Sequence, residues 1–370
     1  MTNVKVIHQK YMQRALELAA LGRFSSMPNP MVGCVIVADG TIVGEGWHAK
    51  AGEPHAEVHA LRAAGAAARG ATAYVTLEPC SHHGRTPPCV DALLAAGIGH
   101  VVIAMEDPNP LVSGQGIARL RDQGVAVTVG ILADAARRLN QGFVARMERQ
   151  RPWLQVKMAA SIDGKTALVN GESQWITSPQ ARQDVHRWRA QSGAILSSAA
   201  TVLADGARLT ARHPHAQQQP LRVIIDSKGL LTADLPLFKE TSPILLVQAE
   251  ETPVVAFPEH VERLILPLTE SGNIDLPALF QALAEKQVNR VWTECGAQLA
   301  GALLQANLVD ELVIYLAPKL IGAAGLSLVA LPEYTAMAQI PELTFTDVRQ
   351  VGDDLRIIAE PRMTLGDQLL

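Results

Sequence analysis

The sequence reads Pro54-His55-Ala56-Glu57 at the start of one predicted helix, and Glu78-Pro79-Cys80, eight further residues and Cys89 at the start of the next. One imidazole and two thiolates suit Zn²⁺, which prefers tetrahedral coordination by nitrogen and sulfur. Three protein ligands leave a fourth position for water, which is typical of a catalytic metal site rather than a structural one. The pattern therefore predicts one catalytic Zn²⁺ per chain, held by His55, Cys80 and Cys89.

Glu57 follows the predicted ligand His55 by two residues. In the first turn of a helix its side chain leans towards the helix N-terminus, so it can reach a metal-bound water without binding the metal. Zn²⁺ lowers the pKa of such a water to about 7. Attack on an amidine carbon, with Glu57 carrying the proton to the departing amine, is the chemistry of zinc-dependent nucleobase deaminases. The spacing of His55 and His59 also occurs in zincin proteases, but their glutamate directly follows the first histidine, so this alternative is disfavoured.

The segment between the two cysteines is longer than the usual Pro-Cys-x-x-Cys spacing of zinc deaminases. Its polar residues 82–86 would lie beside the metal, where they could hold a phosphorylated substrate. Asn29, between two prolines, is either a turn residue or an amide that reads the base, and we favour the second. Cys34, inside an apolar strand, is interpreted as a small buried residue.

The amino-acid composition excludes several classes of protein. The 370 residues suggest two domains, and 48% hydrophobic residues are enough for full-sized cores, which excludes a disordered chain. A net charge of −4 and 4% aromatic residues argue against a nucleic-acid partner. No apolar stretch approaches the ~18 residues of a membrane helix, and no secretory segment is evident. We expect a cytoplasmic enzyme without a membrane partner.

The order of predicted elements indicates an α/β fold. Up to about residue 143 the order is α-β-β-α-β-α-β-α-β-α, with a hairpin at Asp39-Gly40. A charged stretch, 146–152, ends in a proline, and we place the domain boundary near residue 150. The second part, 151–370, is predicted to be another α/β domain whose sheet ends in an antiparallel hairpin formed by 343–349 and 355–360.

Longer strings in the first domain resemble one branch of the cytidine-deaminase-like superfamily, the riboflavin-biosynthesis deaminases. The strings are Pro28-Asn29-Pro30-Met31-Val32-Gly33, Gly52-Glu53-Pro54-His55-Ala56-Glu57, Thr76-Leu77-Glu78-Pro79-Cys80-Ser81-His82, Arg85-Thr86-Pro87-Pro88-Cys89 and Asp107-Pro108-Asn109-Pro110. The bifunctional bacterial form of this family fuses the deaminase to a pyrimidine reductase, which 151–370 resembles.

This resemblance implies an N-terminal three-layer α/β/α domain, 1–150, and a C-terminal dihydrofolate-reductase-like α/β domain, 151–370. It implies deamination of 2,5-diamino-6-(5-phosphoribosylamino)pyrimidin-4(3H)-one, then NADPH reduction of the ribosyl group to ribityl. The small-molecule ribotide would be the partner, in a homo-oligomer, with a dimer favoured. In the first domain, the residues expected to contact substrate are Asn29, Arg85, Asp107 and Asn109.

The second domain has no Gly-x-Gly-x-x-Gly after any strand, so a Rossmann fold is not expected. A predicted strand instead runs into a helix at Glu294-Cys295-Gly296, and such a turn can hold a cofactor phosphate. The resemblance implies that NADPH binds there. The expected cofactor residues are Ala159, Trp175, Thr201, Asp205, Ser227, Gly296, Ala297, Gln298, Leu299, Ala300, Gly301 and Ala302. Those expected to bind substrate are Ser173, Arg189, Leu209, Arg212 and Glu294. Those expected to polarise it are Lys157, Asp205 and Glu294.

Two other classes of function compete with this interpretation. One is a tRNA- or nucleic-acid-editing deaminase with an accessory domain, which the acidity, the few aromatic residues and the long segment between the cysteines disfavour. The other is a binding protein with structural zinc, which would be expected to show a fourth Cys or His ligand.

Overall fold

The computed structural model describes residues 2–82 and 87–362. The chain forms two compact units, Met1–Arg151 and Pro152–Leu370, so the division falls beside the boundary expected near residue 150. Residues 146–149 of the charged stretch belong to the last helix of the first unit, α6 (Gln141–Arg149). Among the described residues, no helix is long and apolar enough to cross a bilayer.

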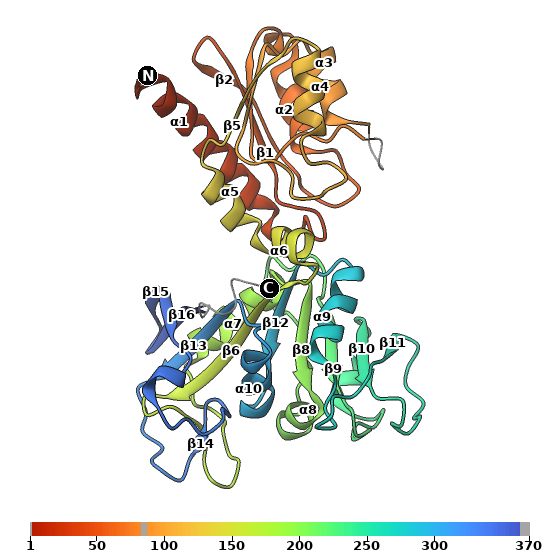
Figure 1. The fold of residues 1–370 in the computed structure, drawn as a ribbon, viewed down its shortest axis with the longest axis vertical. Helices are drawn as coiled ribbons and strands as arrows, with labels where there is room; N and C mark the ends of the chain where they lie inside the picture. Colours follow the sequence, from red (N-terminus) through yellow and green to blue (C-terminus); the bar gives the residue numbers. More distant parts are fainter. Residues whose placement is uncertain (1, 83–86, 363–370) are drawn as a thin grey trace. The chain divides into compact units, whose positions relative to one another are not determined.

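The first unit is a five-stranded sheet with helices on both faces (Figure 1). The strands, in their order across the sheet, are β2 (Thr41–Trp47), β1 (Gly33–Ala38), β3 (Thr72–Val75), β4 (His100–Ile103) and β5 (Ala126–Val129). β1 pairs antiparallel with β2 and β3, and the other neighbours are parallel. One face packs against α2 (Ala56–Ala64), α3 (Cys89–Ala95) and α4 (Gln115–Asp122), and the other against α1 (Thr2–Ala19), α5 (Ala133–Leu139) and α6. The three-layer α/β/α arrangement is confirmed.

Glycines in the outer hairpin determine how closely α2 approaches the sheet. The predicted turn at Asp39-Gly40 is confirmed, since both residues have positive φ (48° and 75°) and so twist the turn to match the strands. A Cβ added at Gly44 would lie 2.2 Å from the Ala60 carbonyl oxygen, and one at Gly46 would lie 2.4 Å from that of Ala56. Only glycine at these two positions of β2 lets α2 lie directly on the strand.

The predicted order of elements ends in one helix, over about 133–143, and this is wrong. The helix is interrupted at Asn140, which separates α5 from α6. The Asn140 side chain bonds the backbone of Met31, accepting from its N–H and donating to its carbonyl oxygen, both at 2.8 Å. This contact spans 109 residues and anchors the loop that contains Asn29. Sequence periodicity carries no signal for such a contact.

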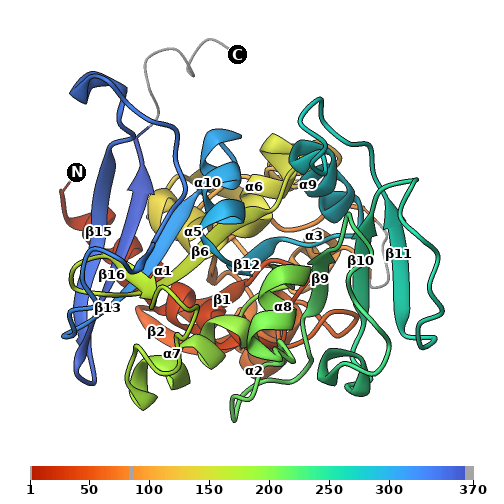
Figure 2. The ribbon, with the colours of Figure 1, turned by 90° about the horizontal axis from the view of Figure 1, so that it is seen from below.

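The second unit is built on a nine-stranded mixed sheet (Figure 2). Its strands, in order across the sheet, are β11 (Val261–Ile265), β10 (Ile244–Gln248), β9 (Leu221–Ile225), β8 (Ala194–Ser198), β12 (Arg290–Glu294), β6 (Trp153–Ser161), β13 (Glu311–Ala317), β16 (Asp354–Pro361) and β15 (Leu343–Val351). The pairs from β11 to β13 are parallel, and β16 and β15 complete the sheet as an antiparallel hairpin, as expected. Two short strands, β7 (Lys165–Ala167) and β14 (Leu326–Ser327), pair separately.

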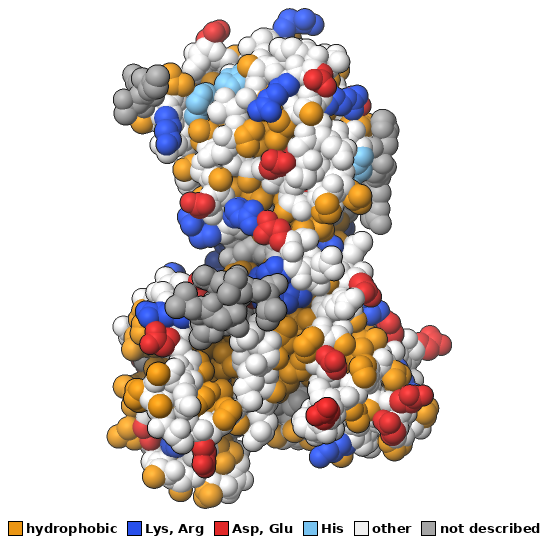
Figure 3. Space-filling model, viewed as in Figure 1, with side chains coloured by type: hydrophobic (Ala, Val, Ile, Leu, Met, Phe, Trp, Pro, Cys, Tyr) orange, Lys and Arg blue, Asp and Glu red, His pale blue; other side chains and the backbone are white. Residues whose placement is uncertain are grey.

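Helices cover both faces of this sheet. α9 (Leu276–Glu285) and α10 (Ala297–Gln305) pack on one apolar face, and α7 (Pro179–Ala190) and α8 (Ala199–Asp205) on the other. Sequence reasoning missed α8, which is one of the walls of the cavity described below. On the face drawn in Figure 3, and for the described residues, basic and acidic side chains are interspersed rather than gathered into one basic surface.

Candidate functional site

The three predicted metal ligands lie together in the first unit. His55 is the residue before α2, Cys89 is the first residue of α3, and Cys80 follows β3 in the intervening segment. The His55 Nδ1 atom lies 3.2 Å from the Cys89 Sγ and 3.6 Å from the Cys80 Sγ. The three ligand atoms all lie within 4.8 Å of one another. One imidazole nitrogen and two sulfurs at this separation fit a single Zn²⁺ between them.

The two thiols lie close enough to share one proton. Hydrogen bonding with Cys89 lowers the pKa of Cys80, while the same contact, with burial, raises the pKa of Cys89. The backbone N–H of Cys89 also donates to the Cys80 Sγ at 3.4 Å. Cys80 is therefore poised as a thiolate, the form that binds metals.

Glu57 lies in the first turn of α2, where only 3% of it is exposed. Its Oε2 atom is buried without a hydrogen-bond partner. Burial is the main reason that the pKa of Glu57 is raised above its usual value. A buried carboxylate with an unsatisfied oxygen next to three metal-binding side chains can hold and release a proton there.

Asn29 lies beside this group through a residue that sequence reasoning missed. The Asn29 Nδ2 atom lies 3.0 Å from the His48 Nε2 atom, and the His48 ring meets the His55 ring edge-on at 5.3 Å between centroids. His48 is 3% exposed and directly follows β2. No local motif marks it, because its place is fixed by pairing of its backbone N–H with the Val32 carbonyl. The amide and two imidazoles thus form one side of the site.

Asp107 and Asn109 are held by a second residue that the sequence analysis did not select, Glu78. This carboxylate is 4% exposed and accepts hydrogen bonds from four backbone N–H groups. The donors are Asp107, Gly114, Gly116 and Ile117, at 2.9–3.2 Å. Glu78 therefore joins the segment that leads to Cys80 with the loop that carries Asp107 and Asn109. Burial raises the pKa of Asp107 to about 6, and its Oδ1 atom accepts from the Asn109 N–H at 2.8 Å. Arg85 lies outside the described residues.

The second unit has a cavity of about 690 Å³ above the central strands β6 and β12. Most of the residues predicted for cofactor and substrate line it. They are Lys157, Ala159, Ser173, Trp175, Arg189, Thr201, Asp205, Leu209, Arg212, Glu294, Gly296 and Ala297. The remaining predicted residues, Ser227 and 298–302, are not part of this lining.

An ion pair forms one wall of the cavity. The Arg189 Nε and Nη2 atoms donate to the two Glu294 carboxylate oxygens at 2.5 and 2.8 Å, and the Arg189 Nη1 atom donates to the Thr210 carbonyl at 2.9 Å. The two side chains are 12% and 14% exposed. Burial alone would raise the pKa of Glu294, but the charge and hydrogen bonds of Arg189, helped by Lys157 and Trp292, hold it at about 2. Glu294 is thus a fixed carboxylate.

Lys157 stands next to Glu294 in the parallel register of β6 and β12. Burial lowers the pKa of Lys157, although Glu294 and Asp205 oppose this. Asp205, the last residue of α8, has its pKa raised by burial. Cys295 also lines the cavity, and burial raises its pKa to about 12. An ammonium of lowered pKa beside two carboxylates can polarise a bound substrate or move a proton.

The start of α10 differs from the rest of the helix. Gly296 is the residue before the helix and, with Ala297, faces the cavity. Gly301 is explained by packing instead, because a Cβ there would lie 1.8 Å from the Ala330 carbonyl oxygen. Ala300 belongs to the hydrophobic core, which Leu299 also contacts. Gly296 therefore lines the cavity, whereas Gly301 allows close packing against Ala330.

Comparison with known proteins finds a matching family for each of the two units. Residues 5–105 match the cytidine and deoxycytidylate deaminase zinc-binding region, and residues 152–357 match the RibD C-terminal domain. The chain is 51% identical over 357 residues to the riboflavin biosynthesis protein RibD of Escherichia coli (strain K12), covering 93% of this chain and 97% of that protein. The RibD of Acinetobacter baumannii, form 1, superposes with a TM-score of 0.90 at 41% identity, over 97% of this chain and 100% of that one. A Thermotoga maritima deaminase/reductase superposes with a TM-score of 0.87 at 33% identity and the same coverage.

Proposed function

The chain belongs to the RibD family of bifunctional deaminase–reductases of riboflavin biosynthesis, and on this premise we propose how its residues perform the two reactions. The Thermotoga relative is described as a diaminohydroxyphosphoribosylaminopyrimidine deaminase and 5-amino-6-(5-phosphoribosylamino)uracil reductase. The first unit therefore deaminates the diaminopyrimidine ribotide, and the second reduces the resulting ribosylaminouracil to its ribityl form. The zinc-binding region and the reductase domain indicate zinc and a nicotinamide cofactor. The observation that carries the proposal is the combination of the ligand group with the buried Glu57 carboxylate.

For deamination, His55, Cys80 and Cys89 would hold one Zn²⁺, which when bound acidifies water at neutral pH. Glu57, whose Oε2 atom has no protein partner, takes a proton from the attacking water and passes it to the departing amine, which leaves as ammonia. Asn29 and His48 hold the pyrimidine edge, and the loop fixed by Glu78 presents Asp107 and Asn109 to the rest of the substrate.

Removing the metal should separate the two activities. A chelator is expected to abolish ammonia release from the diaminopyrimidine ribotide, because the ligand group lies wholly in the first unit. It should leave NADPH oxidation intact when deaminated substrate is supplied. Both rates would be measured before chelation, after it, and after zinc is restored. Loss of both reactions on their separate substrates would contradict a metal-free reductase.

For reduction, NADPH would supply the hydride, with its phosphates near Gly296 and Ala297 at the start of α10. Trp175, Thr201 and Asp205 line the same cavity and would contact the cofactor. We place substrate polarisation at Lys157 and Glu294 because these neighbours in register face the cavity together. Arg189 is engaged by Glu294 and Thr210, so we assign it to holding Glu294 in place and assign the substrate phosphate to the exposed Arg212.

Arg212→Ala should raise the reductase KM for the ribotide and leave NADPH affinity unchanged. A charged hydrogen bond contributes about 1.5–3 kcal/mol, so the expected rise is between about tenfold and 150-fold. Arg187→Ala, on the exposed side of α7, is the matched control. Steady-state kinetics would give the KM, and titration of NADPH fluorescence the cofactor affinity. If Arg212→Ala instead loses NADPH binding and keeps its substrate affinity, Arg212 belongs to the cofactor site and not to the substrate site.

Several expectations from the sequence stay predictions. They are the one-to-one zinc stoichiometry, the preference for NADPH, the contributions of Ser227 and of 298–302 to cofactor binding, the homodimer and the cytoplasmic location.

A further inference from the structure

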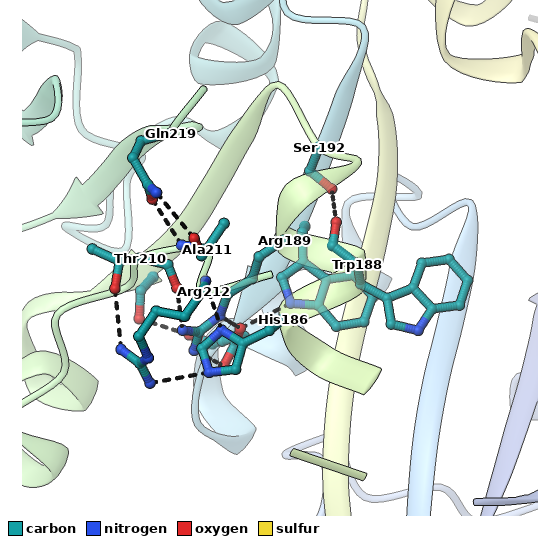
Figure 4. A network of polar contacts seen from close by, with 11 residues as sticks. His186, Trp188, Arg189, Ser192, Thr210, Ala211, Arg212 and Gln219 are labelled. Atoms are coloured by element: carbon teal, nitrogen blue, oxygen red, sulfur yellow. Dashed lines mark hydrogen bonds and ion pairs between the residues drawn. The ribbon is translucent and has the colours of Figure 1, made fainter. Parts of the chain in front are cut away.

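His186, on α7, contacts Arg212 with both of its ring nitrogens (Figure 4). The His186 Nδ1 atom lies 3.2 Å from the Arg212 backbone nitrogen, and the His186 Nε2 atom lies 3.0 Å from the Arg212 Nη2 atom. Both residues line the reductase cavity. His186 was not among the residues singled out from the sequence, because no motif surrounds it.

The His186 ring is uncharged in this position. Burial, together with the positive charges of Arg189 and Arg212, lowers its pKa to about 4, against smaller opposing effects of Glu294 and the Thr210 carbonyl. A neutral imidazole has one nitrogen lone pair, so it accepts from one of the two Arg212 groups at a time. With the lone pair on Nε2 it restrains the guanidinium, and with the lone pair on Nδ1 it restrains the backbone. Only the tautomer with its lone pair on Nε2 accepts from the guanidinium and so orients it.

The backbone around Arg212 is secured independently of His186. The Gln219 side chain accepts from the Ala211 N–H at 2.8 Å and donates to the Ala211 carbonyl at 2.9 Å. The Thr210 carbonyl accepts from Arg189. Figure 4 shows these contacts converging on three consecutive residues. Hydrogen bonds therefore hold the backbone at Thr210 and Ala211, and the Arg212 guanidinium also donates to the Thr210 hydroxyl at 3.1 Å.

An exposed arginine loses side-chain entropy when it is ordered, which is a cost to binding. A side chain already held against an uncharged ring incurs less of that cost on meeting an anion. An imidazolium could not serve, since it would repel both arginines. The contacts of Arg212 are therefore those of a guanidinium that is preorganised to bind a phosphate.

We propose that His186 is a positioning residue that holds Arg212 in the orientation that binds the phosphate of the reductase substrate. The inference rests on the role proposed above for Arg212 and adds the residue that this chain uses to orient it.

The test compares two substrates, the deaminated ribotide and the same compound without its 5′-phosphate. His186→Ala should raise the KM for the phosphorylated substrate by about tenfold, which corresponds to about 1.4 kcal/mol, and leave kcat, NADPH affinity and the KM for the dephosphorylated substrate unchanged. His186→Gln keeps a neutral acceptor of similar reach and should restore most of the affinity. Gln183→Ala, at an exposed position of the same helix, is the control.

The outcomes distinguish this inference from the function it rests on. An unchanged KM in His186→Ala, or an equal rise for both substrates, would overturn it, since the second result is what a general structural defect produces. If Arg212→Ala raises the KM for the phosphorylated substrate and His186→Ala does not, only the role of His186 fails. If Arg212→Ala itself does not discriminate between the two substrates, the proposed phosphate site fails.

Discussion

Glu57→Gln is expected to keep its zinc and to lose deamination by about 10²–10⁴-fold, the usual contribution of a general acid–base group. Glutamine preserves the size of the side chain but cannot take up the proton that the water releases. The Glu57 carboxylate is buried, and its Oε2 atom has no hydrogen-bond partner among the described residues, so this oxygen is available to the water. Ammonia release would be measured alongside the zinc content of the purified variant.

Two comparisons make the Glu57 result specific. Glu53→Gln introduces the same chemical change at an exposed residue before α2 and should leave deamination unaltered. The reductase reaction of Glu57→Gln, on deaminated substrate, should match that of the unaltered protein. Loss of zinc in Glu57→Gln would make Glu57 a ligand rather than a proton carrier, and full activity would remove it from the mechanism.

Arg189→Met should destabilise the second unit by roughly 3–5 kcal/mol, the usual cost of removing one partner of a buried ion pair. Methionine fills much of the space of arginine, so the main loss is the charge opposite Glu294. Denaturant unfolding followed by tryptophan fluorescence reports this unit, because four of the five tryptophans, Trp153, Trp175, Trp188 and Trp292, belong to it.

The double variant Arg189→Met, Glu294→Gln is the control, since it also removes the unpaired carboxylate and should recover part of the stability. If Arg189→Met lowers the free energy of unfolding by less than about 1 kcal/mol, the Arg189–Glu294 ion pair contributes no more than an exposed ion pair does.

The same ion pair predicts a dependence of stability on pH. The pKa of Glu294 is lowered from 4.5 to about 2, so its contribution is fully present above pH 4.5 and is lost as the pH falls towards 2. In Arg189→Met burial would instead raise this pKa, so the folded protein would bind a proton more readily than the unfolded one. The stability deficit of the variant should therefore shrink as the pH is lowered from 7 towards 4.5. A difference in stability between the two proteins that stays constant from pH 7 to 4.5 would contradict the conclusion that Arg189 keeps the Glu294 carboxylate ionised.

The metal site could be predicted from the sequence because its chemistry depends on few residues in a fixed order. His55 precedes α2, Glu57 lies in its first turn and Cys89 begins α3, so the spacing of these three residues carries over into space, and Cys80 lies in the segment that joins β3 to α3. The hairpin at Asp39-Gly40 and the final antiparallel pair followed from local turn and strand patterns in the same way.

What the sequence did not reveal is the pairing of distant polar groups. Glu78 bonds backbone N–H groups up to 39 residues away, and Arg189 meets Glu294 across 105 residues. Backbone N–H groups have no sequence signature, so the partners of Glu78 could not be predicted. An arginine and a glutamate that lie far apart in the sequence, such as Arg189 and Glu294, likewise give no indication that they form an ion pair. The expectation that Arg189 binds substrate gave no indication of its contact with Glu294.

The close contact between β2 and α2 has a consequence for mutational screens of this enzyme. Gly44 and Gly46 contain no reactive atom and lie on the outermost strand of their sheet. A side chain at either position would overlap the backbone of α2 and displace the helix outward, carrying His55 and Glu57 with it. Substitutions of Gly44 or Gly46 would therefore lower deaminase activity although neither residue contacts the substrate. A mutational scan that measures activity alone would wrongly include this edge strand in the active site.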